Sequence, residues 1–312
     1  MESKCAPVAV FTYNRPDHTE RVLDALNVSA LAPDTDIFIF CDNYKDESAK
    51  HNVQRVWDLV DQFAYKSRFK SVTINKSETN KGLATSIICG VSEIMVLYGR
   101  VIVVEDDLLA SIHFLEYMNS ALDFYKNNKH IWSISGYAFP MKALSNYPHD
   151  VFMAGRGSSW GWASWIDRWN RVDWDVKDYN TFKHNWSKRH AFARWGRDLP
   201  LMLDAQMTAN HNSWAIRWCY SQFLENMMTV YPKISYIKNI GNDGTGTHKS
   251  LLAEKFDTEV ECGECFECEF EDLTYDKIIR KEFQKKYSPT IIVRIKSLVK
   301  KFLVKLGVYT ST

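Results

Sequence analysis

Residues 100–107 read Arg-Val-Ile-Val-Val-Glu-Asp-Asp, and this stretch decides the fold class that we predict for the chain. Four consecutive β-branched residues are typical of a strand that is buried on both faces of a parallel sheet. Three carboxylates follow directly, and adjacent carboxylates repel one another unless a cation or a basic side chain lies beside them. The stretch therefore predicts a central strand of an α/β sheet that ends at a charged edge.

Three further strand-like runs precede this strand, and a helical pattern follows each of them. The predicted strands cover residues 7–12, 36–41 and 71–75, and the predicted helices cover 16–26, 51–63 and 83–98. This alternation predicts a mostly parallel sheet flanked by helices. Tyr13-Asn14-Arg15, Asp42-Asn43 and Asn80-Lys81 each follow a strand. Because ligands of such sheets bind at the carboxyl ends of the strands, we expect these polar groups to converge with residues 105–107.

The second half of the chain has a different pattern. We predict a loop at 140–148, a helical stretch at 181–211, a strand at 230–238 and a glycine-rich loop at 241–248. Seven of the eleven Trp residues fall between positions 160 and 195, where core packing is favoured over contact with sugar faces. Gly155, Gly157, Ser158 and Ser159 precede Trp160, and such small residues permit close approach of a ligand to the backbone. A packed hydrophobic loop is the alternative.

Composition excludes some classes of function. Thirty-nine basic residues balance 38 acidic ones, so the net charge of +1 favours no nucleic-acid partner. Residues 1–7 lack the apolar core of a secretory signal, and no apolar run is long enough to span a membrane. Seven cysteines form an odd, mostly scattered set, which favours reduced thiols in a cytoplasmic protein.

The carboxylates of Glu105, Asp106 and Asp107 favour a metal site. Mn²⁺ and Mg²⁺ bind carboxylate and phosphate oxygens together, and they thereby connect a protein to a diphosphate. The alternative is a solvated acidic turn before a helix that begins near Ile112.

Four elements in order resemble the GT-A glycosyltransferases, in which an acidic motif after a buried strand holds a divalent metal. They are Glu105-Asp106-Asp107, Trp160-Gly161-Trp162, Asn212-Ser213-Trp214 and the loop 241–248, and the opening stretch 9–16 (Ala-Val-Phe-Thr-Tyr-Asn-Arg-Pro) is similar as well. The sequence most resembles the N-acetylglucosaminyltransferase I type, which acts on N-glycans, and related bacterial enzymes of surface-polysaccharide synthesis. The resemblance covers about residues 6–250.

The resemblance implies a GT-A-type (Rossmann-like) fold and a nucleotide-sugar donor site. Residues 1–110 would form the nucleotide-binding half of a domain over 1–255, and residues 111–255 would bind the donor sugar and the acceptor. The implied donor-binding residues are Thr12, Asn14, Arg15, Asp42, Lys81, Leu83, Glu105, Asp106, Trp160, Gly161, Trp162, Trp214 and His248, and Asp107 is the implied ligand of Mn²⁺ or Mg²⁺. Each also has a structural interpretation: Arg15 as a surface helix residue, Asp42 as a turn residue, Lys81 as a solvated charge.

The catalytic base is where the sequence departs from the resembling enzymes. An inverting transferase needs a base for the proton of the acceptor hydroxyl, and the resembling enzymes place an acidic residue just before the Trp of the third element. This sequence has Asn212 there, and an amide is no base at neutral pH. Asp204 and Asp243 are the nearest carboxylates, and His211 is a titratable neighbour. The assignment stays open among these positions.

The remaining chain is a C-terminal extension over 256–312. Cys262, Cys265 and Cys268 resemble part of a zinc site, but no fourth ligand lies nearby in the sequence, which favours a structural coincidence. Residues 290–308 form a basic amphipathic helical pattern. We expect it to contact an anionic membrane on its cytoplasmic face, with packing on the protein body as the alternative.

These features together predict a metal-dependent glycosyltransferase. It would move a sugar from a nucleoside-diphosphate donor, with UDP implied by the resemblance, to a glycan or lipid-linked acceptor with inversion. One alternative is a non-catalytic nucleotide-sugar or glycan-binding protein with a degenerate site, which Asn212 favours. Another is a sugar nucleotidyltransferase, although residues 12–15 lack the glycines of its phosphate loop.

Overall fold

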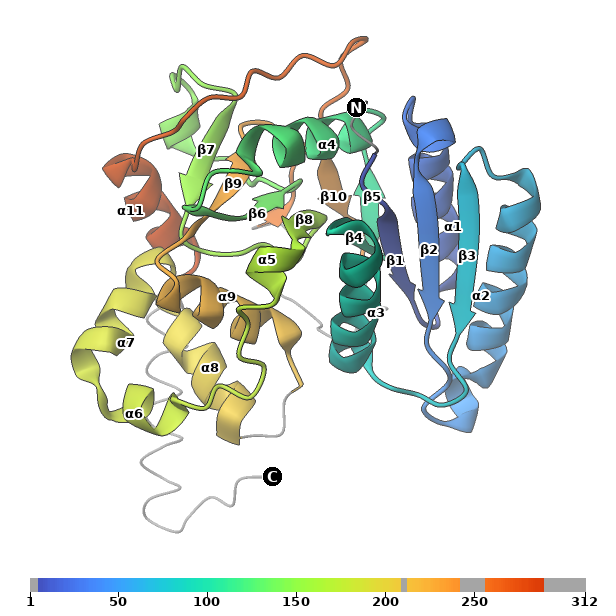
Figure 1. Cartoon of the computed structure of the whole chain (residues 1–312), viewed down its shortest axis with the longest axis horizontal. Coiled ribbons are helices and arrows are strands. Elements are labelled where there is room, and N and C mark those ends of the chain that lie inside the picture. Colours follow the sequence, from blue (N-terminus) through green and yellow to red (C-terminus); the bar gives the residue numbers. More distant parts are fainter. Residues whose placement is uncertain (1–4, 209–211, 242–255, 289–312) are drawn as a thin grey trace.

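The computed structural model describes residues 5–208, 212–241 and 256–288 of the 312-residue chain (Figure 1). The strands are β1 (Val8–Thr12), β2 (Asp36–Cys41), β3 (Ser71–Lys76), β4 (Arg100–Glu105), β5 (Leu108–Ala110), β6 (Ile131–Ser135), β7 (Val151–Ala154), β8 (Trp162–Trp165), β9 (Met228–Pro232) and β10 (Ile237–Asn239). The helices are α1 (Pro16–Asn27), α2 (Glu47–Lys66), α3 (Leu83–Tyr98), α4 (Phe114–Tyr125), α5 (Ile166–Trp169), α6 (Tyr179–His184), α7 (Trp186–Phe192), α8 (Leu199–Thr208), α9 (Trp214–Leu224) and α11 (Lys277–Lys286). Three 3-10 turns are η1 (Ala32–Asp34), η2 (Lys142–Leu144) and η3 (Ala193–Trp195).

One eight-stranded sheet runs through the molecule in the order β3-β2-β1-β4-β8-β6-β9-β7. The four N-terminal strands are mutually parallel, whereas β8 is antiparallel to both β4 and β6. The predicted α/β class is confirmed, with parallel pairing concentrated in the first half. The chain passes from β1 to β2 on one side and returns to β4 on the other. In open sheets, ligands bind at the carboxyl ends of the strands where the order reverses, which here are β1 and β4.

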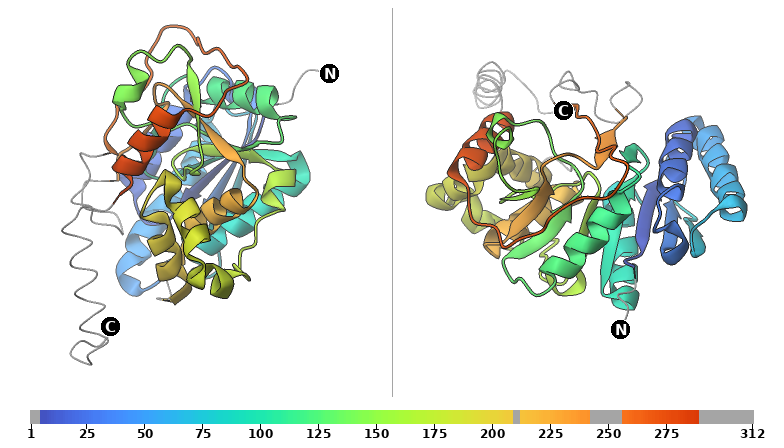
Figure 2. Two further views of the ribbon diagram at one scale, coloured as in Figure 1. Left: turned by 90° about the vertical axis from the view of Figure 1, so that its left-hand side faces the viewer. Right: turned by 90° about the horizontal axis from the view of Figure 1, so that it is seen from above.

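Helices cover both faces of the sheet, as the views in Figure 2 show. On one face, α1, α2 and α4 pack against inward residues of β1, β2 and β4 such as Val8, Val10 and Ile102. On the other face, α3 and α9 pack against Ala9, Phe11 and a group of indole rings. Alternate residues of β1 thus enter two separate cores, which explains why the strand has no polar residue before Thr12.

Two predicted elements of the second half are divided in the structure. The strand predicted at 230–238 is split into β9 and β10, because Pro232 has no N–H with which to continue the ladder. The helical stretch predicted at 181–211 is divided into α6, α7, η3 and α8. Asn185 starts α7 by accepting the backbone N–H of Lys188, and Gly196 separates η3 from α8.

The segment 256–288 packs along the second half of the sheet. Ile279 and Phe283 of α11 are fully buried, and the aromatic ring of Phe283 contacts Phe152 and Tyr231. The predicted amphipathic segment 290–308 lies outside the described residues. Among the residues that are described, no helix has the length and apolar character needed to cross a membrane.

Candidate functional site

The ends of β1 and β4 place their polar residues side by side. Phe11 is the register partner of Glu105, so the residues that follow each strand emerge together at the reversal of strand order. Thr12 is buried and its hydroxyl donates to the carbonyl of Phe40, while Asn14 is half-buried. The backbone N–H of Tyr13 donates to Asp106 at 3.3 Å. The structure thus brings the predicted residues of both strand ends into one site.

Arg15 connects the two strand ends electrostatically. Its guanidinium makes a short ion pair with Asp106 and a second ion pair with Asp107 Oδ2 at 3.1 Å. Arg15 occupies the N-cap position of α1, directly before Pro16, which fixes the start of the helix. Among the described residues, Arg15 is the only cation that pairs with this row of carboxylates, so their negative charge exceeds the positive charge beside them.

Burial and the excess negative charge raise the pKa values of two carboxylates in this row, Glu105 and Asp106. Burial, together with the charges of Asp107 and Asp106, raises the pKa of Glu105 to about 8 although Arg15 opposes it. Burial also raises the pKa of Asp106, which is 4% exposed, although Arg15 again acts in the opposite direction. Such buried carboxylates are energetically costly unless further positive charge arrives.

The segment after β10 covers Asp107 closely. β10 pairs with β5, and the N–H of Ile240 donates to the carbonyl of Asp107 at 2.8 Å. A Cβ at Gly241 would come within 3.0 Å of both the Asp107 carboxylate and the Arg15 guanidinium. Only glycine permits this approach. Asp243 and His248 follow in the part of the chain that is not described.

Asp42 organises the turn between β3 and α3. Its two carboxylate oxygens accept the backbone N–H groups of Lys81 at 2.8 Å and Gly82 at 2.9 Å, as well as the Asn80 side-chain amide at 3.2 Å. Most of its acceptor capacity is therefore used within the protein. Lys81 is exposed and Leu83 is 51% exposed at the start of α3, so both side chains are free to contact a ligand.

The donor set fits a hard divalent cation that is shared with a ligand. Within the described ranges, no three Asp, Glu, His or Cys side chains are placed to hold a metal ion together. Mg²⁺ and Mn²⁺ commonly use one or two carboxylates and complete their coordination with phosphate oxygens and water. Asp107, whose side chain is 19% exposed, and the raised pKa of its neighbour Glu105 suit that arrangement.

The indoles of the two tryptophan elements have different environments. Trp162 is fully buried and packs against Trp169, Trp214 and Trp218, and Trp214 is only 3% exposed. For these two side chains the structure supports core packing. Gly161 adopts a left-handed φ of 58°, and the side chain of Ile237 in β10 fills the space that a Cβ at this position would need. Only Trp160 of this element is half-exposed.

A cavity of about 200 Å³ opens beside Trp160. It is lined by residues 156–160, by Leu199 and Met202 of α8, by Ala215, Ile216 and Cys219 of α9, and by Tyr137, Phe256 and Tyr287. The ring of Trp160 lies edge-on to Tyr137 with centroids 4.5 Å apart. Aromatic walls with nearby hydroxyl groups of Ser158 and Ser159 suit the faces and hydroxyls of a sugar.

The glycines before Trp160 serve internal packing. A Cβ at Gly155 would collide with the ring of Trp195, and one at Gly157 would crowd Trp218. The close approach that the sequence predicts at these positions is therefore made by the protein's own indoles.

The candidates for the catalytic base differ in the partners that their side chains already have. Asp204 makes a bidentate ion pair with Arg189, at 2.8 and 2.6 Å, and also accepts the Tyr179 hydroxyl. The exposed side-chain carbonyl of Asn212 accepts from Arg217 at 3.1 Å. His211 and Asp243 lie outside the described residues.

Sequence reasoning missed a buried charge pair at the wall of the cavity. Arg156 is 9% exposed, makes two 2.9 Å hydrogen bonds to Asp198, and lies 3.8 Å from the ring centroid of Tyr287. These groups are separated by 42 and 131 positions in the chain, so no local pattern joins them. The glycines on either side of Arg156 are the only local signal, and they also have the packing role described above.

The three cysteines of the extension differ in their exposure to solvent. Cys262 and Cys265 are exposed, whereas Cys268 is half-buried, and burial raises its pKa to about 12. In the part of the chain that the structure describes, they belong to no group that would hold a metal ion.

No family model and no curated protein matches the sequence. The solved structures that are similar to this one include those of S. aureus TarS and GalNAc-T7. The crystal structure of S. aureus TarS has 11% sequence identity and a TM-score of 0.39, and the match covers 76% of this chain and 37% of that one. The crystal structure of GalNAc-T7 with UDP, GalNAc and Mn²⁺ has 9% identity and a TM-score of 0.45, and the match covers 75% of this chain and 43% of that one. This chain therefore spans about two fifths of the length of either protein.

Proposed function

We propose that this protein is a metal-dependent glycosyltransferase that moves a sugar from a nucleoside-diphosphate donor, UDP-linked by preference, to a hydroxyl of a glycan or lipid-linked acceptor. One observation carries the proposal: Arg15 and Asp107, from the ends of two parallel strands, lie 3.1 Å apart where the strand order reverses. A diphosphate needs a cationic donor and a metal-binding carboxylate at adjacent positions, and this edge supplies both.

The donor would bind with its diphosphate between Arg15 and Asp107. The guanidinium of Arg15 would donate to a phosphate oxygen, and Asp107 would hold Mn²⁺ or Mg²⁺ with support from Glu105. A bound divalent cation supplies charge neutralisation to the departing diphosphate. Thr12, Asn14, Lys81 and Leu83 would contact the nucleoside. Because Asp42 is occupied by the turn at residues 80–82, its proposed role is to position Lys81 and Leu83.

The sugar would extend toward Trp160. Two observations support this direction: Ile237 of β10 lies against Gly161, the neighbour of Trp160, and β10 leads to Gly241 beside Asp107. Trp160 would contact a sugar face, and Ser158 and Ser159 would accept or donate hydrogen bonds to hydroxyl groups.

In the transfer step, the acceptor oxygen forms a bond to the anomeric carbon as the bond to the phosphate oxygen breaks. The acceptor proton passes to a base, and the nucleoside diphosphate leaves. We propose Asp243 as that base, since Asp204 is held by Arg189 and an amide at position 212 accepts no proton. Asp243 follows Gly241 by two residues.

The proposal is tested by incubating the protein and Mn²⁺ with a panel of nucleotide sugars and measuring release of the nucleoside diphosphate, with the wild type beside Asp243→Asn. Release from one donor, strongly reduced in the variant, is expected. NMR of the glycoside product is expected to show an inverted anomeric configuration. The absence of release from every donor, with and without added glycans, would count against the enzyme.

One observation favours a second candidate, a non-catalytic nucleotide-sugar-binding protein. Among the candidate positions that the structure describes, the carboxylate of Asp204 is held by Arg189, and Asn212 carries an amide in place of a carboxylate. This candidate predicts metal-dependent donor binding without any turnover. For both candidates we propose a cytoplasmic location, with residues 290–308 on an anionic membrane surface.

A further inference from the structure

The segment 181–197 has a charge pattern that the proposed donor site does not use. It contains five Lys and Arg residues and no Asp or Glu. In the structure it forms the end of α6, all of α7 and η3, at the lower left of Figure 1. Lys188 and Arg189 are paired with Asp178 and Asp204. For the other three, Lys183, Arg194 and Arg197, the described residues provide no ion-pair partner, and all three are exposed.

A large aromatic side chain projects from the same segment. All eleven Trp residues lie in the described part of the chain, and Trp186 alone among them is exposed, at 78%. Asn185 caps the helix at the preceding position, and the indole stacks on His190 with ring centroids 5.4 Å apart. The ring is therefore held in a defined position at the surface. Exposing an indole to water costs free energy that a lipid headgroup region recovers.

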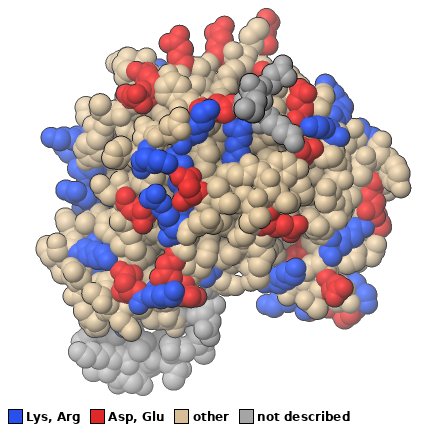
Figure 3. All heavy atoms as spheres, in the orientation of Figure 1, with Lys and Arg blue, Asp and Glu red and all other residues tan. Residues whose placement is uncertain are grey.

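Neighbouring elements extend this surface. Leu201 and Met202 of α8 are 43% and 40% exposed. α11 packs on η3, where Gln284 donates to the carbonyl of Ala193, and its exposed Lys277, Lys281 and Lys285 recur at intervals of four residues. Figure 3 shows basic side chains on the side of the molecule that α7 and α11 occupy.

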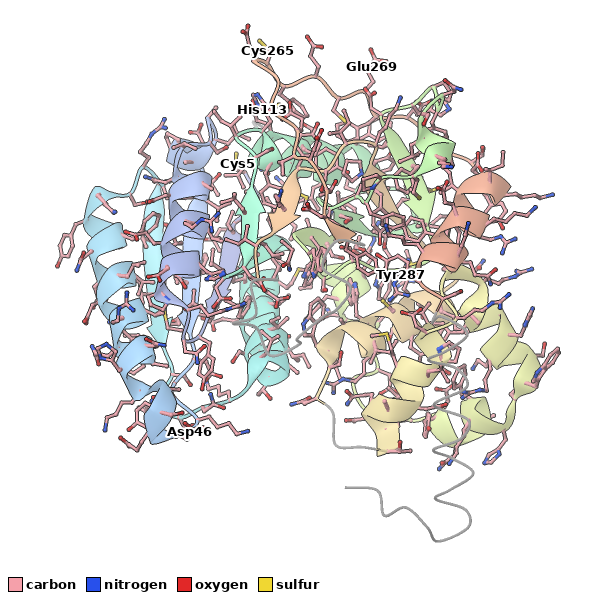
Figure 4. All side chains as sticks on the ribbon, turned by 180° about the vertical axis from the view of Figure 1, so that it is seen from behind. Cys5, Asp46, His113, Cys265, Glu269 and Tyr287 are labelled. Carbon is pink, nitrogen blue, oxygen red and sulfur yellow. The ribbon has the colours of Figure 1, made fainter. Side chains whose placement is uncertain are left out.

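The charge at another end of the molecule is opposite. Residues 256–276 contain nine Asp and Glu residues and no Lys or Arg. Acidic side chains gather along the top edge of Figure 3, and Glu269 is labelled at that edge in Figure 4, remote from α7. An anionic surface would attract the α6–η3 end and repel the acidic end, so the separation of charge would orient the protein.

From this geometry we propose that residues 181–202 form a membrane-contacting surface that binds anionic lipid, with Trp186 in the headgroup region and Lys183, Arg194 and Arg197 at the phosphates. Exposed apolar side chains beside unpaired cations suit a lipid surface, which offers both apolar and anionic groups. α11 lies against the same surface, since the N–H of Asp198 donates to the carbonyl of Tyr287, the residue that follows this helix.

The surface adjoins the cavity beside Trp160, because Met202 is exposed and also lines that cavity. A lipid-linked acceptor in the membrane would then lie close to the proposed sugar site. This last step rests on the proposed function, whereas lipid contact at Trp186 does not.

The test uses the full chain and vesicles of phosphatidylcholine with or without phosphatidylglycerol. Quenching of Trp fluorescence by brominated phosphatidylglycerol is expected to be strong in the wild type and largely lost in Trp186→Phe. Trp57→Phe, on α2, is the matched control and is expected to retain it. Equal quenching in Trp186→Phe and wild type would show that another part of the chain makes the lipid contact, and would overturn the proposal.

A charge variant tests the cations separately. Lys183→Ala/Arg194→Ala/Arg197→Ala is expected to lower partitioning onto anionic vesicles by about 100-fold at low salt. Arg21→Ala/Arg68→Ala/Lys70→Ala removes the same residue types from exposed positions of the N-terminal half and is expected to leave partitioning unchanged. Equal losses in both variants would contradict the proposal. So would binding of the wild type to an oligonucleotide and not to either vesicle.

Discussion

The backbone of Gly241 lies against the carboxylate of Asp107, at a distance that leaves no room for a Cβ. Two segments that are more than 130 residues apart in the chain meet there, because β10 pairs with β5 directly after the acidic row. Arg15 reaches the same carboxylate from the end of β1. The proposed metal and diphosphate site thus depends on three separate parts of the chain.

Replacement of Gly241 tests this contact. Gly241→Ala would displace either the Asp107 carboxylate or the segment after β10, so we expect metal-dependent nucleotide affinity to fall about tenfold or more. Global stability should change little, since the atoms that the new Cβ would meet belong to the Asp107 and Arg15 side chains and not to the hydrophobic core. Gly263→Ala is the control, because the nearest atom to its Cβ is the flexible end of Glu261. Unchanged affinity in Gly241→Ala would show that Asp107 is not needed in its present position.

The raised pKa of Glu105 predicts a dependence of stability on pH in the absence of metal. The folded protein holds a proton on Glu105 up to a pKa of about 8, whereas the unfolded chain releases it near the ordinary glutamate pKa of 4.5. The free energy of unfolding should therefore fall as pH rises through this window. Glu105→Gln should remove that part of the slope and be the more stable protein near pH 8. Urea unfolding with EDTA at pH values of about 5 and about 8 measures the change in the free energy of unfolding with pH for each protein. An equal change in the wild type and in Glu105→Gln would refute the prediction.

Asp42 is expected to act on stability more than on base recognition. Asp42→Asn places an amide N–H against the backbone N–H groups that now donate to the carboxylate, at a cost of about 1–3 kcal/mol. Asp46→Asn is the control, since Asp46 caps α2 and asparagine caps equally well. Denaturant unfolding gives both values. If Asp42→Asn were fully stable but lost its preference among nucleotides, direct contact with the base would be the better account.

The fold of the first half was predictable because each strand there is a continuous apolar run followed by polar residues. The segments 36–41 and 83–98 were predicted with the observed bounds. The second half was harder, since its breaks depend on single residues such as Pro232 and Asn185. For the site, the strand-end groups could be predicted from spacing. The burial of Trp162 and the pairing of Asp204 with Arg189 could not, because they arise from tertiary contacts that leave no periodic pattern.

Replacement of Trp160 is expected to slow sugar transfer without weakening the binding of the nucleoside diphosphate. Trp160→Ala removes one wall of the cavity and leaves Arg15 and Asp107 untouched, so affinity for the free nucleoside diphosphate should be unchanged. The rate of sugar transfer should fall about 10- to 100-fold, as expected for the loss of one well-packed contact with the sugar. Comparison of nucleotide titrations with steady-state transfer kinetics shows the difference. A loss of nucleotide affinity as large as the loss of rate would place Trp160 outside the sugar site.

The most direct test of the central claim is calorimetric titration of the wild type and Asp107→Asn with a panel of nucleoside diphosphates, with and without Mn²⁺. The account predicts that one nucleotide, UDP by preference, binds the wild type only with Mn²⁺, and that Asp107→Asn abolishes this binding. Asp24→Asn, an exposed carboxylate on α1, should bind like the wild type. Failure of the wild type to bind any nucleotide with Mn²⁺ present would contradict the account.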